Sequence, residues 1–179
     1  MFQLNKQDQE TLLQIARDSV QAHLTGHPLE LPAPGSDDVM QTRGVFVSIH
    51  LGTNLRGCVG TIDPSNPLYQ SVAECAVAAA SRDSRFKALQ VSELPEAEFE
   101  ISVLSPIEYV TDIGSIEIGT HGLIVSRGNA RGLLLPQVAV QQQWDRERFL
   151  GETCRKAGLP PTAWRQGATI QRFTAEVFP

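Results

Sequence analysis

Residues 45–61 read VFVSIHLGTNLRGCVGT, and this stretch predicts a β-hairpin. From Val45 to Leu51, apolar residues stand at every second position, which is typical of a strand with one buried face. Gly52-Thr53-Asn54 then suits a three-residue turn, after which a second strand begins at Leu55. We therefore expect an antiparallel sheet built around this hairpin.

The turn length also predicts how the two strands face each other. The expected cross-strand pairs are Leu51–Leu55, His50–Arg56, Ser48–Cys58 and Phe46–Gly60. In this register Cys58 lies on the polar face, and His50 is its diagonal neighbour at about 7–8 Å between backbone positions. A slip of one residue would carry Cys58 to the apolar face.

Cys58 stands between Gly57 and Gly60 and close to Arg56. Glycine weakens a strand interior because it packs no side chain and loses more conformational entropy than other residues. Two glycines around a thiol therefore indicate a bulge, or a close approach by another backbone or by a ligand. We take this segment as the candidate site.

Helices are expected on both sides of the hairpin. A first helix begins after Asn5 and stops at Gly26, with apolar or small residues at helical spacing: Leu12, Ile15, Ala16, Ser19, Val20 and Leu24. The proline-rich residues 27–36 should connect this helix to the hairpin. Asn66-Pro67 predicts a second helix with a stripe of small residues, beside which Cys75 is interpreted as a small core residue.

The rest of the chain adds strands in pairs. A strand is expected at 99–103, a hairpin at 121–127 and 132–135 around Gly128-Asn129-Ala130, a helix from Asp145 to Gly158, and a closing strand over 173–177. Strands that arrive as hairpins, with helices between them, favour an α+β fold with a largely antiparallel sheet over a doubly wound parallel sheet.

Length and composition place the protein in a broad class. The 179 residues fit one domain spanning 1–179, with room for two lobes, and the 41% hydrophobic and 20% charged content is ordinary for a soluble protein. No apolar run approaches the roughly 18 residues that suggest a membrane span. The N-terminus lacks the features of a secretory signal, and the 3 cysteines cannot all pair within one chain, so we expect a cytoplasmic protein.

Charge and missing motifs narrow the function. A net charge of -5 argues against a general electrostatic grip on nucleic acid. The sequence contains no GxGxxG, GxxxxGK[ST], HExxH, CxxC or GxSxG motif, so nucleotide binding and zinc proteolysis lack their usual signals. The histidines and cysteines are scattered, so we expect no metal site, and no cofactor is identified.

Five blocks together resemble one protein family, the AMMECR domain family, which in prokaryotes is called AmmeMemoRadiSam system protein A. The blocks are GVFVSIHLGTNLRGCVGTI (44–62), SRDSRF (81–86), EISVLSPIEYV (100–110), HGLIVSRGNARGLLLPQVA (121–139) and WDRERFLGETCRKAGLPPTAW (144–164). The resemblance covers nearly the full length. After PQVA the family commonly has a glutamate and a glycine, where this chain has Gln141 and Gln143.

The resemblance implies an α+β fold of two subdomains with a cleft near the RGC segment. The prokaryotic family name also implies functional association with a Memo-like protein and a radical-SAM protein. The resemblance implies no particular reaction.

The residues of the candidate site are compatible with two hypotheses for the function. As an enzyme acting on a small molecule or in protein modification, the protein would use Cys58 as nucleophile, Arg56 as its electrostatic support or anion clamp, and His121 or His50 as general base. As a noncatalytic module, it would use the same cleft to bind a small ligand or a partner's peptide segment. The ligand-binding residues would then include Gly57, Gly60, His50 and Gln137.

Overall fold

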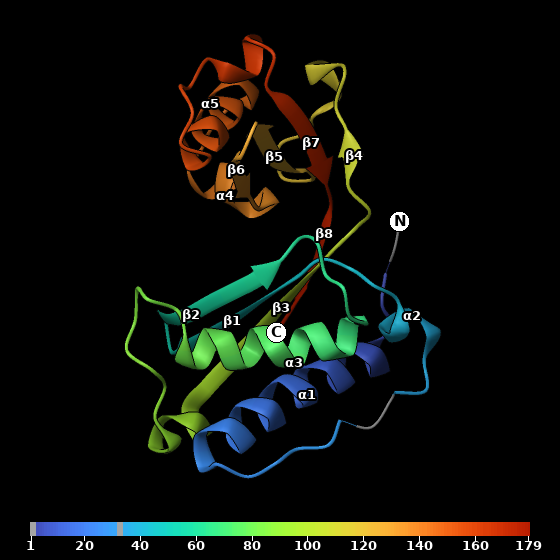
Figure 1. Ribbon diagram of the computed structural model, residues 1–179, viewed down its shortest axis with the longest axis vertical. Helices are drawn as coiled ribbons and strands as arrows, with labels where there is room; N and C mark the ends of the chain where they lie inside the picture. Colours follow the sequence, from blue (N-terminus) through green and yellow to red (C-terminus); the bar gives the residue numbers. More distant parts are fainter. Residues whose placement is uncertain (1–2, 32–33) are drawn as a thin grey trace. The chain divides into compact units, whose positions relative to one another are not determined.

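The computed structural model describes residues 3–31 and 34–179, so Pro32 and Ala33 of the expected connection lie outside the described residues, as do Met1 and Phe2. The chain forms two compact units (Figure 1). The first unit comprises Met1–Leu104 with Glu176–Pro179, and the second comprises Ser105–Ala175.

The first unit contains an antiparallel sheet built on the predicted hairpin. Its strands, in spatial order, are β2 (Asn54–Thr61), β1 (Val45–Leu51), β3 (Ala97–Leu104) and β8 (Ala175–Phe178). Strand β2 is therefore an edge strand, while β1 is paired on both sides. The candidate site lies on an edge that other parts of the chain must cover or cap.

The predicted hairpin is confirmed, but half of its predicted register is wrong. The pairs Ser48–Cys58 and Phe46–Gly60 are as predicted, whereas Leu51 pairs with Asn54 and His50 with Leu55. The turn contains two residues instead of three, with Gly52 at a φ of 57°, and the register shifts between Ile49 and His50. The shift leaves Arg56 as the extra residue of a β-bulge, so His50 does not lie opposite Arg56.

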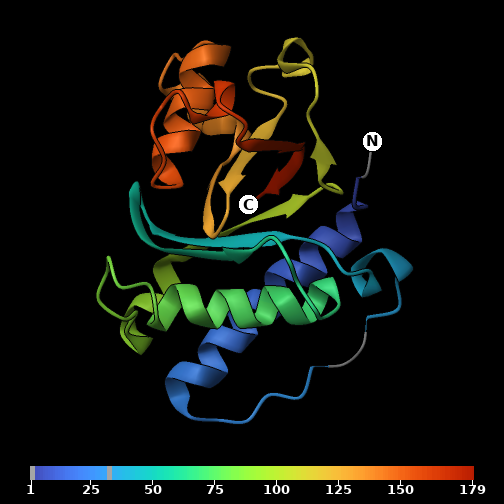
Figure 2. The same cartoon turned by 45° about the horizontal axis from the view of Figure 1, so that its top comes forward.

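Two long helices cover one face of this sheet, α1 (Lys6–Thr25) and α3 (Leu68–Ser81). Figure 2 shows them in blue and green on the same side of the strands. The predicted apolar positions face them and form the core, including Val45, Val47, Ile49, Phe99, Ile101 and Val103. Burying each such side chain contributes about 1.5–3 kcal/mol, so this face fixes the register of the sheet.

The ends of the helices test the predicted caps. Asn5 accepts the backbone N–H of Asp8 at 2.8 Å and Gly26 has a φ of 70°, which confirms both ends of α1. The predicted Asn66 cap is wrong, because its amide donates to Glu74 at 2.9 Å and α3 starts without a side-chain cap. The segments α2 (Asp37–Met40) and the 3-10 helix η1 (Val91–Glu96) complete the unit.

The second unit contains its own antiparallel sheet. The spatial order is β4 (Glu108–Tyr109), β7 (Thr169–Phe173), β5 (Gly122–Arg127) and β6 (Ala130–Leu134). Its helical elements are α4 (Pro136–Gln141), α5 (Arg146–Lys156), η2 (Ile113–Ser115) and η3 (Ala163–Arg165). Its core includes Ile116, Leu123, Ala139, Phe149 and Leu150.

Most predicted elements of the second unit are confirmed, with one exception at the C-terminus. The hairpin at 121–135 and the Asp145 cap, which accepts the Arg148 backbone N–H at 2.8 Å, are present. The expected closing strand is instead two strands, β7 and β8, which belong to different sheets. They separate at Thr174, whose backbone N–H donates to the Ser105 hydroxyl at 2.9 Å instead of to a neighbouring strand.

The predicted α+β class with antiparallel sheets is confirmed. Among the helices of the described residues, none has the length and apolar character required to cross a membrane.

Candidate functional site

The glycines around Cys58 are explained by close packing inside the first unit. A Cβ on Gly57 would lie 1.9 Å from the carbonyl oxygen of Ala79, so only glycine lets α3 approach the strand this closely. A Cβ on Gly60 would lie 2.3 Å from the ring of Phe46, its cross-strand partner. The bulge and the close backbone approach, which the sequence offered as alternatives, are both present, and neither requires a ligand.

Arg56 stabilises the bulge region. Both terminal nitrogens of its guanidinium donate to the carboxylate of Glu93, and Nη2 lies 3.2 Å from Oε2. The two side chains are 20% and 29% exposed, and the hydrogen bond from Arg56 lowers the pKa of Glu93. Nη2 also reaches the carbonyl oxygen of Lys87 at 3.5 Å. Arg56 thus ties η1 and the preceding loop to β2.

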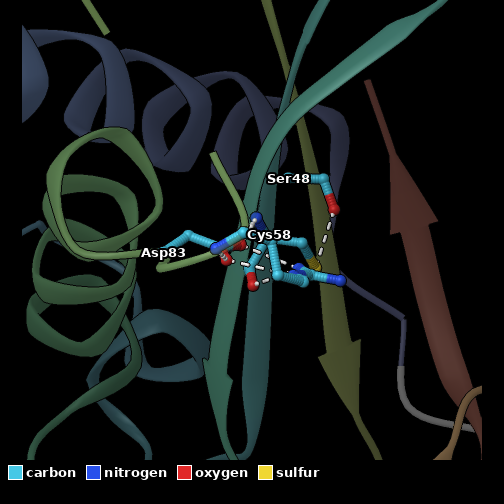
Figure 3. Close-up of polar contacts among 4 residues, drawn as sticks. Ser48, Cys58 and Asp83 are labelled. Carbon is cyan, nitrogen blue, oxygen red and sulfur yellow. Dashed lines mark hydrogen bonds and ion pairs between the residues drawn. The ribbon is translucent and has the colours of Figure 1, made fainter. Parts of the chain in front are cut away.

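Cys58 lies on the face of the sheet that is opposite to the two helices. Its neighbours Gly57 and Val59 face the core, so alternation directs the Cys58 side chain the other way. Ser48, directly across on β1, donates its hydroxyl hydrogen to the Cys58 sulfur at 3.2 Å (Figure 3). Cys58 is half-buried, whereas the other two cysteines are buried.

A second group of contacts holds the backbone of Cys58. The Asp83 carboxylate accepts the Cys58 N–H at 3.0 Å, also drawn in Figure 3, and Arg85 Nη2 donates to the Cys58 carbonyl oxygen at 3.4 Å. Asp83 and Arg85 are themselves paired, with Nε–Oδ1 at 3.0 Å and Nη2–Oδ2 at 2.7 Å. Side chains therefore satisfy the edge-strand groups that a further strand would otherwise bind.

Burial and pairing set the charges of this ion pair. The Asp83 side chain is 6% exposed and that of Arg85 is 58% exposed. The hydrogen bond from Arg85 holds the pKa of Asp83 well below its usual range, and Asp83 raises the pKa of Arg85 in return. Both groups stay charged at neutral pH, with the carboxylate on the inner side and the guanidinium outside.

The other two cysteines are core residues. Cys75 lies in the cluster between the helices and the sheet, as predicted, and burial raises the pKa of its thiol to about 11. Cys154 is fully buried in the second unit, and burial raises its pKa as well. Both of these thiols are therefore protonated at neutral pH. Cys58 differs from them in burial, because it is only half-buried.

The remaining predicted site residues belong to other elements, and two of them belong to the second unit. His121 belongs to the second unit, where its Nδ1 accepts the Glu117 backbone N–H at 2.9 Å, and burial lowers its pKa, with a further contribution from Arg172. The lone pair that a general base would use is therefore engaged in a turn. Gln137 is the second residue of α4, also in the second unit. His50 lies beyond the bulge, opposite Glu98 of β3. The roles predicted for these residues, and the predicted cleft, stay predictions.

Two residues of the site were missed by the sequence reasoning, namely Asp83 and Arg85. Both lie in the SRDSRF block at 81–86, which contributed to the family resemblance. Asp83 is 25 positions from Cys58 in the sequence, and nothing in the block indicated a contact between them. Ser48 was placed opposite Cys58 but was given no role.

The family model named AMMECR1 matches residues 13–178. The chain belongs to the AMMECR1 family. A relative from Methanothermobacter thermautotrophicus is 44% identical over 183 residues, covering 98% of this chain and 95% of the relative. The crystal structure titled "Uncharacterized Protein PH0010 From Pyrococcus horikoshii" matches with a TM-score of 0.91 at 36% identity, covering 98% of this chain and 93% of that chain.

One residue, Gln143, has an unusual backbone conformation at a position where the family resemblance is informative. Gln143 has a φ of 56°, in the left-handed region that favours glycine. This is the position at which the family resemblance predicts glycine. The chain keeps the turn between α4 and α5 with a residue less suited to it.

Proposed function

We propose that this AMMECR1 protein is a cysteine-dependent group-transfer enzyme with Cys58 as nucleophile, acting on a small molecule or in protein modification. The observation that carries the proposal is the hydrogen bond from the Ser48 hydroxyl to the half-buried Cys58 sulfur. A donor directed at sulfur stabilises the negative charge of a thiolate, and the thiolate is the nucleophilic form of cysteine.

Arg85 supports the same chemistry from the other side of the residue. Its guanidinium donates to the Cys58 carbonyl oxygen at 3.4 Å, which places a positive charge beside this residue. The sequence reasoning assigned this place to Arg56, but Arg85 is the arginine that contacts Cys58. Each arginine is paired with a carboxylate, Arg56 with Glu93 and Arg85 with Asp83, and Arg85 is the more exposed of the two. A cation close to a cysteine favours the thiolate.

The covalent step can be written with its atoms balanced. The thiol proton passes to solvent, which reaches the half-buried side chain. The sulfur then forms a bond to an electrophilic carbon of the substrate, the bond from that carbon to the leaving group breaks, and the leaving group departs with the electron pair. A second acceptor, water or another nucleophile, takes the carried group and regenerates the thiol.

Acylation by p-nitrophenyl acetate, a general activated ester, tests this proposal. The expected result is a burst of one equivalent of nitrophenolate and an intact mass increased by one acetyl group located on Cys58. Cys58→Ser should lose both, although it retains Cys75 and Cys154. A wild-type protein that acetylates no faster than free N-acetylcysteine at the same pH would contradict the proposal.

One observation favours a second candidate, a noncatalytic binding module. The partner of the Cys58 sulfur in the first unit is a hydroxyl group and not an imidazole or a carboxylate, so the described residues of that unit place no acid–base group in contact with the sulfur. In this case Cys58 and Arg85 would bind a ligand, or a segment of a Memo-like or radical-SAM partner. A stable complex with the purified Memo-like protein on gel filtration, abolished by Arg85→Ala, together with no acylation burst, would favour this candidate.

A further inference from the structure

We propose that Arg85 binds an anionic group of the substrate, so that the substrate of Cys58 is an electrophile that carries a carboxylate or a phosphate. The inference rests on the proposed function and adds a substrate class to it. It is carried by the arrangement of the Arg85 guanidinium, which is fixed on one edge and open on the other.

The hydrogen bonds of Arg85 use two of its three guanidinium nitrogens, Nε and Nη2. Nε and Nη2 bind the two oxygens of Asp83, and Nη2 also reaches the Cys58 carbonyl oxygen. Within residues 3–31 and 34–179, Nη1 makes no hydrogen bond, so its two N–H groups are free to bind a ligand. The side chain is 58% exposed, so a small anion can reach this edge from solvent.

The guanidinium is held in place before any ligand arrives. Asp83 binds it with two hydrogen bonds and also accepts the backbone N–H groups of Cys58 and Arg85. The guanidinium also lies over the ring of Phe86, with its central carbon 5.2 Å from the ring centroid. An arginine oriented in this way loses little conformational entropy when it binds an oxyanion.

Neighbouring acidic groups do not prevent anion binding at this edge. The Asp83 carboxylate is buried on the opposite side of the guanidinium, so the pair presents its positive end to solvent. Glu100 lies across from Ser48 on β3, two strands from Cys58 and therefore about 10 Å away. Arg85 approaches β2 from its outer edge, farther still from Glu100.

The free edge of Arg85 and the thiol belong to one small site. Arg85 contacts the carbonyl oxygen of the same residue whose sulfur accepts the Ser48 hydroxyl. A short substrate can therefore place its anionic group on Arg85 and its electrophilic carbon at the Cys58 sulfur. Iodoacetate, which joins a carboxylate to a reactive carbon, is a suitable probe, and neutral iodoacetamide is its matched reagent.

The first experiment measures the rate of Cys58 alkylation by iodoacetate and by iodoacetamide, using peptide mass spectrometry. Relative to the same ratio for N-acetylcysteine, the iodoacetate-to-iodoacetamide ratio should be raised by about tenfold, the size expected for one charge-assisted hydrogen bond. Arg85→Gln should return the ratio to that of the free thiol, and Arg85→Lys should give an intermediate value. Arg82→Gln, three positions away on the same exposed segment, is the matched control and should keep the wild-type ratio.

The outcomes separate this inference from the proposed function. A wild-type ratio equal to that of the free thiol, or an Arg85→Gln protein that keeps the raised ratio, would overturn the role of Arg85 alone. Failure of Cys58 to react with either reagent would overturn the proposed function itself.

A second experiment uses the wild-type protein and so does not depend on folding of a variant. Sodium phosphate and sodium acetate, each at constant ionic strength set with chloride, should slow alkylation of Cys58 by neutral iodoacetamide in a saturable manner. Stronger protection by phosphate or by acetate would identify the anionic group that the site prefers. An absence of protection by both anions would contradict the inference.

Discussion

The hydroxyl group of Ser48 donates a hydrogen bond to the sulfur of Cys58 at 3.2 Å, between two neighbouring strands. The two residues are direct cross-strand partners, and the paired strands hold their backbones in fixed register. The hydrogen bond is thus a consequence of the hairpin, and its effect on the thiol can be separated from the fold.

Replacing Ser48 by alanine should slow alkylation of Cys58 by iodoacetamide at neutral pH by about tenfold or more. The reason is the loss of a hydrogen bond to a charged sulfur, which contributes about 1.5–3 kcal/mol. Ser48→Thr, which keeps the hydroxyl group, should react at close to the wild-type rate. Equal rates for Ser48→Ala and wild type would show that the hydrogen bond does not activate the thiol.

Replacing Arg56 by alanine should affect stability more than reactivity. Its ion pair with Glu93 is largely buried and ties η1 to the bulge, so its loss should lower the free energy of unfolding by about 1–3 kcal/mol in urea denaturation. The alkylation rate of Cys58 should fall less than in Arg85→Ala. The reverse order of the two rates would restore the role predicted for Arg56 from the sequence.

The buried Asp83 carboxylate should make stability depend on acid pH. Because its pKa in the folded protein lies well below its ordinary value of about 4, the unfolded state binds more protons. The stabilisation is complete above pH 4 and is lost as the pH falls further, toward the folded pKa. Glu93, whose pKa is also lowered, contributes in the same direction.

Asp83→Asn isolates this contribution in denaturation experiments at several pH values. At pH 7 the variant should be less stable than wild type, because it loses the ion pair with Arg85. The loss should be only about 1–2 kcal/mol, because Arg85 is exposed to solvent, which weakens the pair. The difference should shrink below pH 4. Asp37→Asn, at an exposed position in the first turn of α2, should show no comparable change. A constant difference between Asp83→Asn and wild type down to pH 2 would refute the assignment.

Gln143→Gly should stabilise the protein. A residue with a side chain at a φ of 56° is strained, and glycine relieves the strain while adding some entropy to the unfolded chain. The net gain should be about 0.5–1 kcal/mol in thermal or urea unfolding. Gln142→Gly, next to it at a helical φ of -91°, should destabilise instead, and a gain at both positions would point to another cause.

The parts of the fold that depend on local patterns were predictable from the sequence. The ends of α1 at Asn5 and Gly26 were predictable because capping and left-handed backbone conformation are local properties. Alternation of apolar residues identified the buried face of β1. A bulge in this strand was expected, but its position at Arg56 was not predictable, because it results from pairing of β1 with both β2 and β3 and from the two-residue turn at Gly52. The predicted pairing of Ser48 with Cys58 is nevertheless correct, because the register shifts only between Ile49 and His50, on the turn side of this pair.

The contacts that complete the site are long-range and therefore left no local signal. Asp83 and Arg85 reach Cys58 because α3 returns along the sheet and ends beside β2, which the sequence spacing alone does not indicate. For Gly57, the sequence indicated a close approach by another group but not which group approaches. The structure shows that it is the carbonyl group of Ala79 in α3.

The most direct test of the central claim is a residue-resolved measurement of thiol reactivity in the wild-type protein. Limiting iodoacetamide at pH 7, followed by peptide mass spectrometry, gives separate rates for Cys58, Cys75 and Cys154. Cys58 should react at least about tenfold faster than N-acetylcysteine, the gain expected from one hydrogen bond to a thiolate, while the two buried cysteines should react far more slowly. A Cys58 that reacts no faster than the free thiol would contradict the account.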